Sequence, residues 1–124
     1  MKPMERERFE ELVDIAVGGM PQEFLDRLDN VVILVADQPT PLQLRKPRLR
    51  RGHLLLGLYE GVPRTERGTG YGMVLPDKIT LFKKAIELVC RSEEEVTAQV
   101  RATVLHEIAH HFGISDRRLR ELGR

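Results

Sequence analysis

The spacing of hydrophobic residues predicts two helices near the start of the chain. Between residues 8 and 19 the apolar positions recur on one helical face, and the glycines at 18 and 19 end the segment. This face consists of Phe9, Leu12, Val13, Ala16 and Val17. Pro21 is well suited to begin a second, shorter helix over residues 21–30. Its inward-facing residues are Phe24, Leu25 and Leu28.

The middle of the chain predicts strands and loops. The continuous β-branched run in residues 31–37, VVILVAD, predicts a buried strand. Residues 53–61, HLLLGLYEG, predict a second strand, and the alternation in residues 78–86, KITLFKKAI, predicts a third. Residues 38–52 contain three prolines and residues 62–72 are rich in glycine, so both are predicted to be loops.

A long helix is predicted near the end of the chain. Ser92 and Glu95 have the spacing of a capping box, and Gly113 is a typical C-terminal stop. One apolar stripe contains Val96, Val100, Val104 and Ile108, and Leu105, Ala109 and Phe112 widen it. The more polar stripe contains Gln99, Thr103, His106 and His110. Ser115 then predicts the cap of a short last helix over 116–123.

Composition indicates an ordinary globular protein. A chain of 124 residues, 41% hydrophobic and 31% charged, predicts one domain over residues 1–124. The net charge of +1 favours neither a dedicated nucleic-acid binder nor a membrane-surface protein. The charged N-terminal segment lacks the apolar core of a signal peptide, and the run 31–36 is far too short to span a bilayer. The single Cys90 cannot form an internal disulfide, which suits a reducing compartment, so we expect a cytoplasmic protein. We also expect a monomer.

The helix ending at Gly113 also carries a pattern that predicts a metal site. His106 and His110 are four residues apart, so a helix places both imidazoles on one side. Glu107 lies beside them, as in the H-E-x-x-H pattern of zinc hydrolases, where the glutamate acts on a water activated by the metal. Gly113 allows a sharp turn, after which Asp116 can return as a third ligand. Three protein ligands leave one position open, as a catalytic zinc site requires.

Each of these residues has a simpler interpretation. Two histidines on a helix are often surface or packing residues, and Asp116 could simply stabilise the start of the last helix. Asp14 or another acid could replace Asp116 as a ligand, although no spacing singles one out. We interpret His111 as a residue at the rim of the site and give no metal role to His53 or Cys90. Two histidines and a carboxylate also suit iron, but the helix geometry and the glutamate favour zinc.

The segment HEIAHHFGISD resembles the active-site segment of zincin-like metallopeptidases. The whole chain resembles a small bacterial family of minimal zincin-like metallopeptidases, through this segment, PDKITLFKKAIE and the opening that runs from Phe9 to Asp37. The resemblance implies an α+β fold with a small mixed sheet of three or four strands packed on the motif helix. It implies metal ligands at His106, His110 and Asp116, with Glu107 as the catalytic acid and base. All four methionines precede the motif, so the chain departs from metzincins, which carry a methionine turn after it.

Three functions follow from these observations. The first is a zinc-dependent peptidase acting on a peptide or unfolded-protein substrate, which pairs with an edge strand at 54–61 or 78–86. Tyr71, in the glycine-rich loop, is a candidate oxyanion donor, although an ordinary packing role is the simpler reading. The second is a zincin-like module that binds metal for a regulatory purpose without efficient catalysis. The third is nucleic-acid binding through the basic loop 45–51, which the scarcity of aromatic residues argues against.

Overall fold

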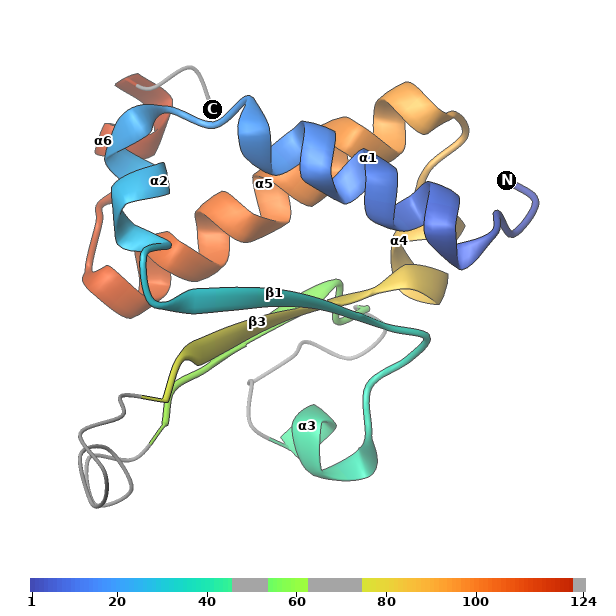
Figure 1. The fold of residues 1–124 in the computed structure, drawn as a ribbon, viewed down its shortest axis with the longest axis horizontal. Helices are drawn as coiled ribbons and strands as arrows, with labels where there is room; N and C mark the ends of the chain where they lie inside the picture. The colour runs from blue at the N-terminus through green and yellow to red at the C-terminus, as the bar shows by residue number, and fades with distance from the viewer. Residues whose placement is uncertain (46–53, 63–74, 122–124) are drawn as a thin grey trace.

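The computed structural model describes residues 1–45, 54–62 and 75–121, and within them it forms a layer of helices on a three-stranded sheet (Figure 1). The strands are β1 (Val31–Ala36), β2 (Gly57–Glu60) and β3 (Asp77–Phe82), in the order β1-β3-β2. β1 runs parallel to β3, and β2 runs antiparallel to it. This mixed sheet packed on a long helix confirms the α+β fold class that the resemblance implied.

The helical layer is formed mainly by α1 (Arg6–Gly18) and α5 (Glu93–Phe112), which lie side by side across one face of the sheet (Figure 1). The short helices α2 (Gln22–Arg27) and α6 (Asp116–Glu121) lie at one end of this layer. The predicted helical faces are confirmed, because the core joins them to the helix-facing side of β3. Its fully buried members include Phe9, Ala16, Ile79, Leu81, Val96, Val100, Val104 and Ile108. Phe112, however, is 45% exposed and does not extend the apolar stripe of α5.

The two predicted caps of the C-terminal helices are confirmed. The Ser92 hydroxyl accepts a hydrogen bond from the Glu95 N–H at 3.2 Å, whereas the Glu95 carboxylate accepts from the Arg91 N–H and not from that of Ser92. Gly113 ends α5 with φ of 70°, a left-handed conformation that glycine adopts without strain. The Ser115 hydroxyl accepts from the Arg118 N–H and caps α6.

Two helices were missed in the sequence. α3 (Pro41–Arg45) lies within the segment predicted to be a loop. Its start is a reciprocal capping box, because Thr40 and Gln43 each accept the other's backbone N–H, and Pro41 occupies the first helical position. α4 (Lys83–Val89) replaces the second half of the third predicted strand. A change of period at Phe82 separates strand from helix, since Ile79 and Leu81 alternate whereas Lys83, Ile86 and Glu87 are buried at helical spacing.

The strand predictions need three further corrections. β1 is not buried on both faces: Val32 and Leu34 are 41% and 45% exposed, because the helices cover only one side of it. β2 is shorter than the predicted segment 53–61, of which His53 lies outside the described residues. β3 is the central strand, so the segment beginning at residue 78 cannot be the edge that receives a substrate. None of the helices formed by the described residues is long and apolar enough to cross a membrane.

Candidate metal centre

α5 presents His106 and His110 on the same side, one turn apart. Their ring centroids lie 6.2 Å apart with an angle of 66° between the ring planes. His106 is partly buried and His110 is exposed, so the pair lies at the surface and is open to an ion from solvent. Zinc binds an imidazole nitrogen at about 2.0–2.1 Å, so rings with this separation can both reach one ion between them. The two histidines therefore fit a divalent metal.

A second stripe of α5, formed by Thr103, Glu107 and His111, faces β2. Thr103 meets the start of the strand: a Cβ on Gly57 would lie only 2.7 Å from the Thr103 Cγ2. One turn later, the Glu107 Oε1 accepts the backbone N–H of Tyr59 at 2.8 Å. A further turn on, the His111 ring stacks on the Tyr59 ring with a centroid distance of 3.9 Å. The side of α5 that docks the edge strand therefore adjoins the side that carries the two histidines.

Glu107 is held in a partly buried position between the helix and the strand. Burial raises the pKa of its carboxyl group above the ordinary value, and the Tyr59 N–H and the nearby His110 oppose this change only in part. A raised pKa favours the protonated form, which is the direction useful to a group that takes up and returns a proton near neutral pH. The carboxylate is thus oriented by a backbone donor and made more basic by its surroundings.

Asp77 anchors the Tyr59 side chain beside this site. The Tyr59 hydroxyl donates to the Asp77 Oδ2 at 2.6 Å, and the Val62 N–H donates to the Asp77 Oδ1 at 2.9 Å. The His111 Nε2 lies 3.9 Å from the same Oδ2. Neither Tyr59 nor Asp77 was predicted from the sequence to belong to the site. They meet because β2 and β3 pair with Tyr59 opposite Ile79, and neither the pairing partner nor the register is encoded in a local pattern.

The remaining predicted residues have different outcomes. Asp116 is the first residue of α6, three positions after the left-handed Gly113, but its side chain is outside what the structure describes. Among the described side chains, no third histidine, cysteine, aspartate or glutamate joins the histidine pair. Asp14 lines a groove between α1 and β1 instead. Cys90 is buried, which raises the pKa of its thiol. Arg45 ends α3, whereas Lys46, Arg48, Arg50, Arg51 and Tyr71 lie outside the described residues.

Comparison with known proteins agrees with this geometry. The family described as zincin-like metallopeptidase matches residues 28–124, which contain the sheet, the histidine pair and Glu107. The chain therefore belongs to the zincin-like metallopeptidase family. It is also similar to a solved structure, a conserved hypothetical protein from T. thermophilus, with 28% identity and a TM-score of 0.57. That similarity covers 88% of this chain and 94% of the other. No curated protein matches the chain.

Proposed function

We propose that this protein is a zinc-dependent peptidase that hydrolyses peptides or unfolded protein segments. In this proposal His106, His110 and Asp116 hold one zinc ion, and Glu107 is the general base. The observation that supports it best is the position of Glu107, between the histidine pair and the outer edge of β2, with its Oε1 held by the Tyr59 N–H. The Tyr59 N–H fixes one carboxylate oxygen and leaves the orientation of the other defined beside the histidine pair.

The roles of the protein groups follow from this arrangement. When bound, zinc supplies Lewis acidity, which lowers the pKa of water and polarises a carbonyl oxygen. Because the Tyr59 N–H holds the Glu107 Oε1, the Glu107 Oε2 is the oxygen that takes the proton from the attacking water. Glu107 later returns this proton to the leaving amine. Burial of Glu107 raises the pKa of its carboxyl group, which is the direction that favours proton uptake.

β2 is the strand that would align the substrate. Leu56 pairs with β3 through its carbonyl, which accepts the Phe82 N–H at 2.9 Å, so alternate residues direct their backbone groups away from β3. Gly57 and Tyr59 are these outward residues, on the edge where Glu107 lies. Because the Tyr59 N–H is already donated to Glu107, an extended peptide could add to this edge at Gly57 through main-chain hydrogen bonds, which demand little of its sequence. Unfolded segments meet that requirement better than folded surfaces.

Zinc content tests the proposed metal centre. Elemental analysis of untagged protein should give near-stoichiometric zinc in the wild type and in Glu107→Gln, which removes no ligand. His110→Ala should lose the metal, and Asp116→Ala should bind it at least about tenfold more weakly because one of three ligands is gone. A wild-type protein that takes up no zinc when zinc is supplied would remove the basis of the proposal.

Hydrolysis of an unfolded protein separates the peptidase from a metal-binding module without catalysis. With labelled casein as the probe, Glu107→Gln should reduce turnover by about 100-fold or more while zinc content is unchanged. Glu94→Gln, on the exposed first turn of α5, is the matched control and should leave turnover unchanged. Zinc binding together with hydrolysis that is insensitive to Glu107→Gln would favour the metal-binding module.

A further inference from the structure

β1 forms an open edge of the sheet, on the opposite side from the candidate metal centre. Among the described strands, β1 pairs only with β3. The Asp77 N–H donates to the Asn30 carbonyl at 3.1 Å. This hydrogen bond shows which residues of β1 point their backbone groups toward β3. Because backbone groups alternate in direction along a strand, the N–H and C=O groups of Val32 and Leu34 then point toward β3. Val31, Ile33 and Val35 direct their backbone N–H and C=O groups outward.

Hydrogen bonds made by Val31 and Val35 confirm that the backbone groups of these residues point away from β3. The Val31 N–H donates to the Leu28 carbonyl, and the Arg6 guanidinium donates to the Val35 carbonyl. Among the described residues, no backbone hydrogen bond outside the sheet involves either backbone group of Ile33, the N–H of Val35 or the C=O of Val31. β1 thus offers alternating donors and acceptors to an added strand.

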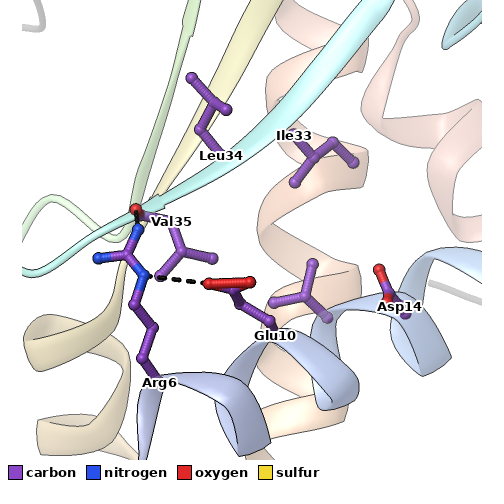
Figure 2. A pocket seen from close by; sticks show the side chains of 7 residues that line it. Arg6, Glu10, Asp14, Ile33, Leu34 and Val35 are labelled. Atoms are coloured by element: carbon purple, nitrogen blue, oxygen red, sulfur yellow. Dashed lines mark hydrogen bonds and ion pairs between the residues drawn. The ribbon is translucent and has the colours of Figure 1, made fainter.

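A groove of about 220 Å³ runs between this edge and α1, and three charged side chains follow one another along it (Figure 2). Arg6 lies beside Val35 at one end, and Asp14 lies at the other. Glu10 stands between them and pairs with Arg6 at 3.0 Å. No described side chain forms an ion pair with Asp14. The groove therefore has a positive group beside the end of β1 and an unmatched negative group toward its start.

β1 lacks most of the features that prevent edge strands from pairing. Its sequence, VVILVA, contains no charged residue and no proline, and Val32 and Leu34 are exposed on the face away from the helices. Among the described side chains, only Arg6 covers an outward carbonyl, and this side chain is itself exposed. An edge of this kind favours the addition of another strand.

We propose that the occupant of this edge is β1 of a second copy of the chain, added in antiparallel orientation. Pairing all three outward residues requires Ile33 opposite the partner's Ile33, and Val31 opposite the partner's Val35. Arg6 lies beside Val35, so this register brings it to the partner's Asp14, and the two-fold axis repeats that ion pair. Val32 and the partner's Leu34 then lie opposite each other and cover apolar surface.

The pairing is self-complementary in its hydrogen bonds, in its apolar contacts and in the ion pair between Arg6 and the partner's Asp14. It forms a six-stranded sheet in which both β2 edges lie at the outside, so each candidate metal centre stays accessible. The interface is small, so association is weak and reversible, and the expected monomer is the dissociated form at low concentration. This inference does not rest on the proposed peptidase activity.

Charge reversal provides the test. Sedimentation of the wild type, up to a protein concentration of about 1 mM, should show a monomer–dimer equilibrium. Asp14→Arg and Arg6→Glu should each weaken association about tenfold or more, because each places like charges across the axis twice. An equal mixture of the two variants should associate again, since both contacts of the mixed dimer join opposite charges. Glu7→Arg, an exposed change on α1 outside the groove, is the control and should leave association unchanged.

The association of the wild type, the two single variants and their mixture decides whether β1 pairs with β1 of a second copy. Restored association in the mixture alone supports the antiparallel register at β1. A wild type that is monomeric over the whole concentration range would overturn the proposal, and so would dimerisation of both single variants at wild-type strength. Circular dichroism melting curves of all variants confirm that each is folded before its association is interpreted.

Discussion

The two edges of the sheet have similar backbone chemistry but different surroundings. On β2, the outward N–H of Tyr59 is taken by Glu107 of α5, and the Tyr59 side chain is fixed by Asp77 and His111. On β1, one exposed arginine reaches one outward carbonyl, and the rest of the edge borders a groove. An edge becomes a candidate site when a neighbouring helix supplies a partly buried polar group to it, as Glu107 does for β2. An edge without such a group is available for association.

The largest effect is expected from a substitution that forces β2 away from α5. Gly57→Ala places a Cβ 2.7 Å from the Thr103 Cγ2 and 3.2 Å from the Thr80 carbonyl oxygen, so either the strand or the helix must shift. We expect a loss of about 3 kcal/mol in the free energy of unfolding, measured in urea. Thr103→Ser removes the clashing methyl group and keeps the hydroxyl that accepts from Gln99.

The double variant Gly57→Ala/Thr103→Ser is the control for the cause of this loss. It should recover part of the stability, because the contact with the Thr80 oxygen remains. Strictly additive effects of the two changes would show that crowding at Thr103 is not the reason for the loss.

The next effect concerns the support behind Tyr59. Asp77→Ala leaves the Tyr59 hydroxyl and the Val62 N–H without their acceptor, and we expect a loss of about 2 kcal/mol in unfolding free energy. Tyr59→Phe removes one of these hydrogen bonds and keeps the ring stacked on His111, so it should cost about 1 kcal/mol. Urea unfolding measures both. Equal losses in the two variants would mean that the Val62 contact contributes nothing.

The smallest effect is expected at the other edge. Arg6→Ala removes an exposed ion pair with Glu10 and the contact with Val35, so the monomer should lose less than about 1 kcal/mol. Urea unfolding at low protein concentration measures this quantity without a contribution from association. If Arg6→Ala lowered the unfolding free energy as much as Asp77→Ala, the contacts at the β1 edge would contribute as much stability as those at the β2 edge. That result would contradict the difference between the two edges.

Local sequence patterns predicted the helices of the core and the order of groups on α5. The spacing of Phe9, Leu12 and Ala16, and of Val96, Val100 and Val104, specifies which helical faces are buried, because a helix brings residues three and four apart together. The same rule placed His106 and His110 on one side. The capping box of Thr40 and Gln43 is also present in the sequence, but the surrounding prolines and basic residues favoured the prediction of a loop.

Sequence alone thus determined the histidine pair, the glutamate beside it, the turn at Gly113 and the caps of the last two helices. Each depends on residues within a few positions of one another along one helix. Three features follow from tertiary packing instead: β3 is central, β2 packs on α5 at Gly57, and Tyr59 and Asp77 adjoin Glu107. These contacts join residues 18 to 48 positions apart, and they depend on strand order and register. Strand order and register are set by the packing of the whole core, so no short segment encodes them.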